Sequence, residues 1–300
     1  RAERSKERET QKEKISQKAQ LGKLKIRKRD GLNVLFNPQK IRKTVSRACQ
    51  KYPETTSVDS IVKELTRNIF DGATTVDIER ALILSSTAFI ERDPDYSKVS
   101  ASIFLQRLYK EGMEISITDG ALDDQYRRTF IDGIRLGVKN DYLSEKLLEF
   151  DLEKLSNSLE PQRDELFEFI GIQTLYERYL LSHEGRKFEL PQAFWMRVAM
   201  GISINEKNKD SRALEFYNKL SSMEFISSTP TLFHSGTPHP QLSSCYLTTV
   251  SDDLAHIFKC VGDNAQLSKW SGGLGNDWTN IRATGSRIKS TNVESQGAVP

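Results

Sequence analysis

The chain has 300 residues, of which 37% are hydrophobic and 28% are charged, and its formal net charge is +3 at pH 7. These values are ordinary for a globular protein of about two domains, and so small a charge does not by itself favour a nucleic acid as partner. No run of about 18 apolar residues is present to form a membrane helix, and no secretory signal peptide is visible. We therefore expect neither a membrane nor a nucleic acid among the partners.

The first segment, residues 1–23, is strongly charged. Residues 1–30 together carry twelve Lys or Arg against five Asp or Glu. A nucleic-acid-binding arm is one interpretation, but few apolar side chains precede Leu21, which favours a solvated linker. Because the sequence begins with Arg1 rather than methionine and stops at Pro300, we expect it to be a piece of a longer chain.

Residues 24–36 predict a β-hairpin. Apolar and basic side chains alternate before Asp30-Gly31, which is a strong turn signal, and an apolar run follows. Asn37 is then expected to cap a helix that begins at Pro38. An asparagine side chain accepts hydrogen bonds from the free backbone N–H groups of a helix, and proline fits the first turn.

Three more amphipathic helices complete a small domain over residues 24–113. The spacing of their apolar residues places them near 57–70, 75–92 and 95–111. Thr74 and Asp77 have the spacing of a capping box at the start of the second of these helices. The predicted domain is therefore a hairpin followed by four helices.

A helical region is expected from residue 114 to residue 224. Apolar residues recur at helical spacing between short polar breaks, over 122–138, 142–157, 163–182, 191–204 and 210–224.

The pattern changes from residue 225 onward. Pro, Gly and Ser residues are interspersed among short apolar runs in residues 225–250, which predicts short strands and tight loops. Residues 271–277 are predicted to form a glycine-rich turn, followed by a strand near 278–283. A helix is expected over 252–270, with inward-facing Leu254, Ile257, Val261 and Ala265. Helix and strand alternation predicts an incomplete α/β barrel or sheet over residues 225–300.

Three cysteines are present, at positions 49, 245 and 260. They have neither a disulfide framework nor metal-ligand spacing, so we expect no metal site and a reducing cytoplasm. Cys49 and Cys260 lie on apolar helix faces and are interpreted as packing residues. Cys245 stands among small polar residues, which leaves a reactive thiol open beside the alternative of a buried strand residue.

A phosphate-binding site is one interpretation of the basic hairpin. Lys28 and Arg29 would neutralise phosphate charge, and the helix start at Asn37 would add backbone N–H donors. The spacing alone is equally typical of a solvated surface.

Hydroxyl groups and glycines gather in three later stretches, 227–232, 243–245 and 271–275. Such groups suit a polyhydroxylated, phosphorylated ligand. Each stretch alone is unspecific.

Taken together and in this order, these elements resemble the large subunits of ribonucleotide reductases. Residues 24–113 resemble the ATP-cone, and 228–300 resemble the opening of the family's ten-stranded α/β barrel. The resemblance implies an α+β fold and reduction of ribonucleoside diphosphates at the 2′-hydroxyl by thiyl-radical chemistry. It also implies allosteric control by nucleoside triphosphates and a role in supplying DNA precursors.

The resemblance assigns catalytic and substrate-binding roles in the barrel opening. Cys245 matches the first cysteine of the redox pair, whose partner lies beyond residue 300, as does the radical cysteine. Thr229, Ser244 and the backbone at Cys245 and Gly273 match positions that bind the substrate. The fragment by itself is expected to be inactive.

The resemblance also places an allosteric specificity site at the start of the 252–270 helix, at a dimer interface. Asp252, Asp253 and Leu254 match its helix start, with Asp252 as a ribose partner. Arg282 and Lys289 match phosphate partners. Taken alone, Asp252 reads as an ordinary N-cap, and the two cations as surface residues.

The nucleotide positions of the ATP-cone are matched by a third set of residues. They are Lys28, Arg29, Asn37, Lys40 and Thr75.

Several positions depart from the usual cone pattern. Val34 replaces a polar residue, Glu79 stands where a histidine occurs, and Leu108 and Tyr109 fall near an expected lysine. These changes remove polar and cationic contacts from an anionic ligand. One hypothesis is therefore a cone that folds without binding ATP or dATP tightly, with a further cone upstream that senses them.

The resemblance implies no directly bound cofactor beyond ATP, dATP and other deoxynucleotide effectors. It implies a homodimer, a separate small subunit whose metal supplies the radical, and a thioredoxin or glutaredoxin-type reductant. Two alternatives remain. One is an adenosylcobalamin-dependent reductase, although residues 272–285 look closer to enzymes with a radical subunit. The other is a non-catalytic, DNA-binding ATP-cone regulator, which would have no use for a thiol-bearing barrel opening.

Overall fold

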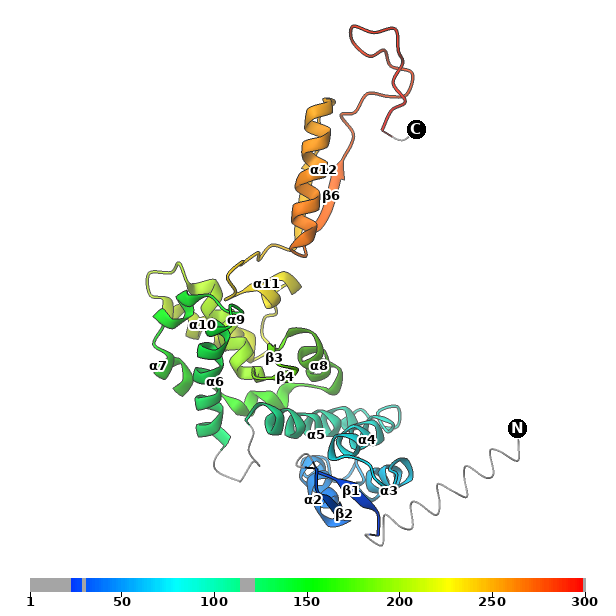
Figure 1. Cartoon of the computed structure of the whole chain (residues 1–300), viewed down its shortest axis with the longest axis vertical. Coiled ribbons are helices and arrows are strands. Elements are labelled where there is room, and N and C mark those ends of the chain that lie inside the picture. The colour runs from blue at the N-terminus through cyan, green and yellow to red at the C-terminus, as the bar shows by residue number, and fades with distance from the viewer. Residues whose placement is uncertain (1–22, 29–30, 114–121, 299–300) are drawn as a thin grey trace, which may run out of the picture. The chain divides into compact units, whose positions relative to one another are not determined.

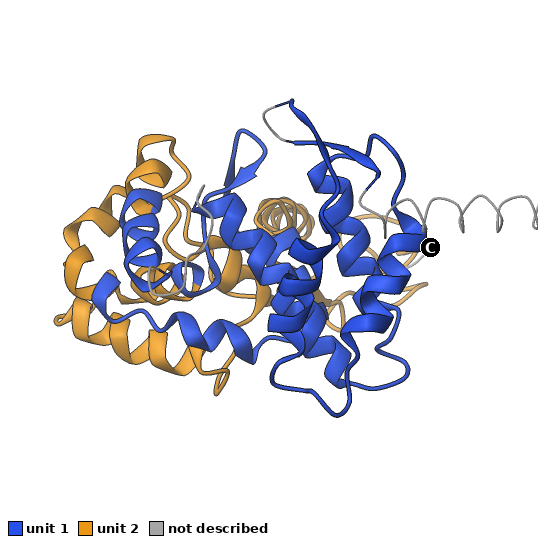
Figure 2. Cartoon of the chain, turned by 90° about the horizontal axis from the view of Figure 1, so that it is seen from below, with its two compact units in different colours: residues 1–133, 156–194 blue, residues 134–155, 195–300 orange. Residues whose placement is uncertain are grey.

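The computed structural model describes residues 23–28, 31–113 and 122–298 (Figure 1). Residues 1–22 of the predicted linker and Arg29 lie outside this part of the chain. Two compact units are present (Figure 2). The first comprises residues 1–133 and 156–194, and the second comprises residues 134–155 and 195–300.

The first unit begins with the predicted hairpin. Strands β1 (Lys25–Arg27) and β2 (Asn33–Leu35) pair in antiparallel register. Helix α2 (Pro38–Cys49) follows, and the Asn37 side chain accepts hydrogen bonds from the backbone N–H groups of Gln39 and Lys40. Both the hairpin and the cap are therefore confirmed, since each depends on interactions within a few residues.

Helices α3 (Val58–Asn68), α4 (Thr75–Thr87) and α5 (Asp95–Gly112) confirm the other three predicted helices. The capping box of Thr74 and Asp77 is present at the start of α4. Helix α4 ends five residues earlier than predicted, because the chain turns after Thr87 and buries Phe89 outside the helix. The core of this bundle includes buried apolar side chains from each helix, namely Val45, Ile61, Leu65, Leu82, Val99 and Leu108.

The helix predicted over 163–182 is wrong as a continuous element. The chain forms η2 (Pro161–Leu166), α8 (Phe169–Thr174), a short π-helix η3 (Leu175–Tyr179) and an unpredicted hairpin of β3 (Ser182–His183) and β4 (Arg186–Lys187). The hairpin turns through Glu184 and Gly185, whose φ angles of 50° and 78° end any helix there.

Helix α6 (Leu122–Lys139) agrees with its predicted range, but the helix predicted over 142–157 is two short pieces, η1 (Glu145–Glu149) and α7 (Leu152–Asn157). Ser144 caps the first piece, and the Asp151 carboxylate accepts from the backbone N–H of Lys154 in the second. Each polar side chain starts a new helix, which interrupts the apolar periodicity. Helices α9 (Pro191–Ser203) and α10 (Lys209–Ser221) agree with prediction.

The strands predicted between residues 225 and 250 are only partly correct. Residues 229–234 form helix α11 (Thr229–His234), with Ser228 at its N-cap position and Pro230 in its first turn, a favourable place for proline. Strand β5 (Cys245–Thr249) follows, and α12 (Leu254–Lys269) leads to β6 (Gly273–Asp277).

Two predictions for this segment are wrong. The glycine-rich segment predicted as a turn contains strand β6, and the strand predicted near 278–283 does not form. Strand β6 pairs with β5 in parallel register. Gly275 permits this close pairing, since a Cβ there would lie 2.8 Å from a methyl carbon of Leu247.

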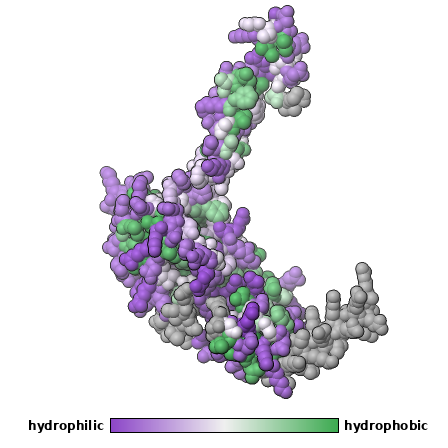
Figure 3. Space-filling model, in the orientation of Figure 1, coloured by the Kyte–Doolittle hydropathy of each residue, from purple (hydrophilic) through white to green (hydrophobic). Residues whose placement is uncertain are grey.

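Helix α12 exposes much of the face predicted to point inward. Leu254 and Val261 are 70% and 51% exposed, whereas Cys260 is buried. Figure 3 shows hydrophobic surface along this helix. Helix α12 packs against β6, and a two-stranded sheet covers too little surface to bury a long apolar face.

Within the described ranges, no helix is long and apolar enough to cross a membrane. The same residues contain no group of three or more His, Cys, Asp or Glu arranged to hold a metal ion.

Candidate functional site

The structure brings Cys245 and Gly273 together at the first position of the paired strands β5 and β6. The backbone N–H of Gly273 donates to the carbonyl of Ser244 at 2.6 Å. A Cβ at position 273 would lie 3.1 Å from that carbonyl oxygen and 3.7 Å from the sulfur of Cys245. Glycine therefore leaves open a space beside the thiol that a side chain would fill.

The thiol of Cys245 is accessible. Its residue is exposed, and the Ser244 hydroxyl lies 3.5 Å from the sulfur. The other two cysteines are free but buried, and burial raises the pKa of the Cys49 thiol although a hydrogen bond with Thr56 opposes this. Among the three, Cys245 alone has the access that thiol–disulfide exchange requires.

Thr229 lies at the exposed start of α11, in the same unit as Cys245. The contact between α11 and the chain before β5 is made by Thr231, whose hydroxyl donates to the carbonyl of Leu242 at 2.8 Å. The Gln241 amide reaches the carbonyl of Trp270 at 3.3 Å and joins the segments that precede the two strands. Sequence reasoning missed both Thr231 and Gln241, although Thr231 stands in the same motif as Thr229.

Two of the predicted specificity residues, Asp252 and Arg282, meet just before α12. Arg282 Nε donates to the Asp252 carboxylate at 2.7 Å. The N-cap is Asp253, which accepts from the backbone N–H of His256 at 2.9 Å, so the interpretation of Asp252 as the cap is wrong. Leu254 is exposed at the first helical position, and Lys289 is exposed farther along the loop after β6.

The predicted cone residues lie on the hairpin and at two helix starts. Lys28 follows β1 and Lys40 lies in the first turn of α2, both exposed, while the side-chain oxygen of Asn37 is used by the helix cap. Thr75 begins α4, and its hydroxyl oxygen is buried without a hydrogen-bond partner in the described part of the chain. A buried polar atom without a hydrogen bond is uncommon in folded proteins and costs free energy.

A small cavity lies between α2, α4 and α5, lined by residues that include Thr44, Glu79, Gln106, Arg107 and Lys110. Lys110 Nζ lies 3.9 Å from Glu79 Oε1. Leu108 and Tyr109, which fall near the lysine expected of a cone, are both buried, whereas Lys110 lines this cavity. Sequence reasoning missed Lys110, which offsets the charge of Glu79.

The first unit also contains a buried polar cluster that had no sequence signal. The Asp164 carboxylate accepts from the hydroxyls of Tyr109 at 2.6 Å and Tyr126 at 3.0 Å, and from the side-chain amide of Gln192 at 2.7 Å. Burial raises the pKa of Asp164 to about 6, although the three donors favour its charged form. This cluster joins α5, α6, η2 and α9.

Three family models match the chain. They are the ATP cone domain over residues 24–111, the ribonucleotide reductase all-alpha domain over 165–240 and the ribonucleotide reductase barrel domain over 243–300.

Curated relatives extend this similarity over most of the chain. The alpha subunit of ribonucleoside-diphosphate reductase from Chlamydia pneumoniae is 43% identical over 276 residues, which cover 92% of this chain and 26% of the relative. The large chain from Schizosaccharomyces pombe is 33% identical, covering 92% of this chain and 34% of the relative. The chain therefore spans roughly a quarter to a third of the length of these relatives.

Proposed function

Because the chain belongs to the family of ribonucleotide reductase large subunits, we propose that it serves the reduction of ribonucleoside diphosphates to 2′-deoxyribonucleoside diphosphates, with Cys245 as one redox-active thiol. The observation that carries this proposal is the exposed sulfur beside Gly273 at the first position of a parallel strand pair. Substrate would bind at Thr229, Ser244 and the backbone of Cys245 and Gly273.

The proposed reduction takes two electrons from a pair of thiols. The substrate 2′-hydroxyl leaves as water, a hydrogen replaces it, and the two sulfurs form a disulfide. An external dithiol of the thioredoxin or glutaredoxin type then restores both thiols. Since Cys49 and Cys260 are buried, we assign the partner thiol and the radical-bearing thiol to residues beyond Pro300, so residues 1–300 alone would have no turnover.

Effector binding is proposed at two sites. ATP or dATP would bind the cone of residues 24–113 through Lys28, Arg29, Asn37, Lys40 and Thr75. A deoxynucleoside triphosphate would bind beside Asp252, Asp253 and Leu254, with Arg282 and Lys289 facing its phosphates. The Asp252–Arg282 contact supports this second site, because it brings together a ribose partner and a phosphate partner.

We propose that the rest of the chain divides into a helical region over 114–224 and the barrel opening over 225–300. We further propose a homodimer in a reducing cytoplasm. Its radical would come from a separate metal-containing small subunit. An adenosylcobalamin-dependent reaction is the alternative, and activity of the longer protein with that cofactor alone would decide for it.

The decisive experiment replaces Cys245 by serine in the longer protein. We expect turnover with a dithiol reductant and the radical subunit to be lost, since a hydroxyl cannot complete the disulfide. Cys49→Ala is the matched control, because it removes a buried thiol outside the barrel opening. Normal multiple turnover of Cys245→Ser would remove the basis of the proposal.

A further inference from the structure

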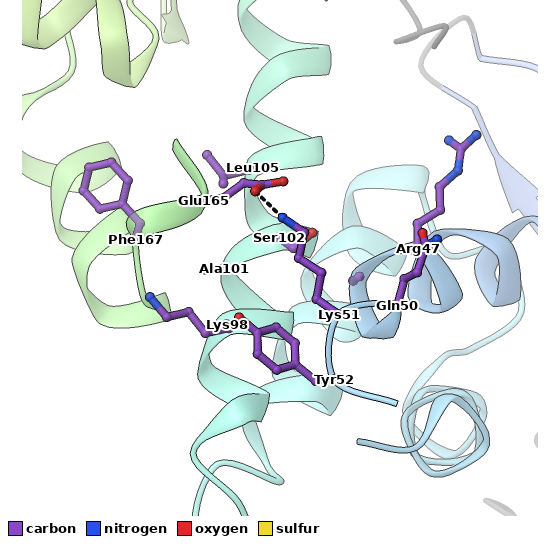
Figure 4. Close-up of a pocket in the computed structure, with 11 residues that line it drawn as sticks. Arg47, Gln50, Lys51, Tyr52, Lys98, Ala101, Ser102, Leu105, Glu165 and Phe167 are labelled. Atoms are coloured by element: carbon purple, nitrogen blue, oxygen red, sulfur yellow. Dashed lines mark hydrogen bonds and ion pairs between the residues drawn. The ribbon is translucent and has the colours of Figure 1, made fainter. Parts of the chain in front are cut away.

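A second cavity in the first unit lies between α2, α5 and η2, away from the residues assigned above (Figure 4). Its volume is about 500 Å³, within the range of small-molecule sites. We propose that this cavity binds a small phosphorylated ligand. Its lining residues include Arg47, Lys51, Tyr52, Lys98, Glu165 and Phe167.

This cavity is separate from the one beside Lys110. On α5 it is lined by Lys98, Ala101, Ser102 and Leu105, which share one face at helical spacing. The cavity between α2, α4 and α5 is lined by a different face of the same helix, formed by Ile103, Gln106, Arg107 and Lys110. A ligand can therefore occupy one cavity without entering the other.

The charges of the lining favour an anion. The lining contains three cationic side chains, Arg47, Lys51 and Lys98, and one carboxylate, that of Glu165. Figure 4 shows Lys51, in the turn after α2, reaching toward Glu165, with which it forms an ion pair. Lys98 Nζ donates to the carbonyl of Leu166 at 2.8 Å. Both ammonium groups thus approach η2 at the cavity wall.

A phosphate can replace the partners that these lysines have in this structure. The side chains of Lys51 and Glu165 are 64% and 62% exposed, and such ion pairs contribute little to stability. A phosphate group presents several anionic oxygens, and charge-assisted hydrogen bonds to them are stronger than a bond to a neutral carbonyl. Glu165 therefore competes with the ligand for Lys51, and removal of its charge is expected to strengthen ligand binding.

The polar and aromatic lining suits a ligand larger than phosphate alone. Gln50 and Ser102 supply neutral hydrogen-bonding groups, and Tyr52 and Phe167 supply rings. Inorganic polyphosphate and a nucleotide share the phosphate chemistry, so both are needed as probes.

The experiment is calorimetric titration of the full chain with inorganic tripolyphosphate and, separately, with AMP and inorganic phosphate. The double variant Lys51→Ala/Lys98→Ala should bind tripolyphosphate about tenfold or more weakly, because two charge-assisted contacts are lost. The matched control is Lys43→Ala/Lys63→Ala, which removes the same charge from exposed positions on α2 and α3. It should bind within about threefold of the unchanged chain.

Glu165→Gln provides the opposite test, and it should strengthen tripolyphosphate binding because the competing carboxylate is gone. If AMP binds more tightly than inorganic phosphate, and if Lys51→Ala/Lys98→Ala weakens AMP binding, the occupant is a nucleotide. If AMP binds no more tightly than inorganic phosphate, the occupant is a phosphate compound without a nucleoside. Equal weakening by both double-lysine variants, or loss of binding only in Lys110→Ala, would overturn the proposal. Circular dichroism of each variant separates loss of binding from loss of fold.

Discussion

Arg282 and Asp252 form an ion pair across 30 residues of sequence, with 2.7 Å between the guanidinium nitrogen and the carboxylate oxygen. The pair connects the loop after β6 to the start of α12. Its side chains are 30% and 33% exposed, so the guanidinium is held in place and still reachable by a ligand.

We predict that Arg282→Ala in the longer protein weakens deoxynucleoside triphosphate binding about tenfold or more, because a charge-assisted phosphate contact is lost. Stability should change by no more than about 1 kcal/mol, since the pair is partly exposed. Equilibrium dialysis and thermal unfolding measure the two effects. Lys259→Ala, which removes an exposed cation from α12, should leave effector binding unchanged. A similar loss in both variants would contradict the assigned role.

Gly273→Ala should impair the reaction more than the fold. The added Cβ would lie 3.1 Å from the Ser244 carbonyl oxygen and 3.7 Å from the Cys245 sulfur, in the space proposed for substrate. We expect KM for the ribonucleotide to rise about tenfold. Gly262→Ala on α12 is the control, because its Cβ would meet nothing within 4 Å. Steady-state kinetics of the longer protein compare the two, and an unchanged KM in Gly273→Ala would argue against substrate approach at this position.

The unpartnered hydroxyl of Thr75 gives a prediction for the cone. Replacing it by valine removes a buried polar atom without a hydrogen bond, and should stabilise the ligand-free chain by about 1 kcal/mol. If that hydroxyl contacts nucleotide, ATP affinity should fall by about tenfold. Chemical unfolding and ATP titration measure the two effects. Unchanged ATP affinity in the valine variant would exclude Thr75 from the site. Micromolar ATP binding by the unchanged chain would contradict the hypothesis of a cone that folds without binding ATP tightly.

Glu79 and Lys110 test the electrostatics of the same cone. Glu79→Gln should tighten ATP binding severalfold, because a carboxylate near the phosphates is removed, whereas Lys110→Ala should weaken it. Titrations at low and high salt would show whether the difference is electrostatic, since salt screens such charges. Equal ATP affinities in both variants would place the nucleotide away from this pair.

The Asp164 cluster predicts an unusual pH dependence of stability. The carboxyl pKa is raised from 3.8 to about 6 in the folded chain. Between these values the unfolded chain loses the proton while the folded chain keeps it, so the contribution of Asp164 to stability is greatest below about pH 4 and falls as the pH rises to about 6. The pKa difference corresponds to about 3 kcal/mol.

Urea unfolding between about pH 4 and pH 7 measures this slope. Asp164→Asn should remove the part that Asp164 contributes, because the amide does not ionise. Asp124→Asn is the control, since Asp124 lies on α6 with a side chain that is 75% exposed. Equal slopes for Asp164→Asn and the unchanged chain would show that the buried carboxyl does not titrate in this range.

Local signals in the sequence predicted much of the first domain. The Asn37 cap and the Thr74–Asp77 capping box depend on residues at most three positions apart, and both were confirmed. Elements whose partners are distant were missed. Strand β6 is rich in glycine and has little strand propensity, and it forms because β5 pairs with it.

The sequence by itself determined the local elements, the family resemblance and Cys245 as the thiol of interest, because these reside in short-range hydrogen bonds, apolar spacing and motif order. The tertiary structure alone decided which side chains meet. Tyr109 and Asp164 are 55 residues apart in sequence, and Cys245 and Gly273 become neighbours only through strand pairing. Contacts between distant residues follow from how helices and strands pack, and no local pattern encodes that packing.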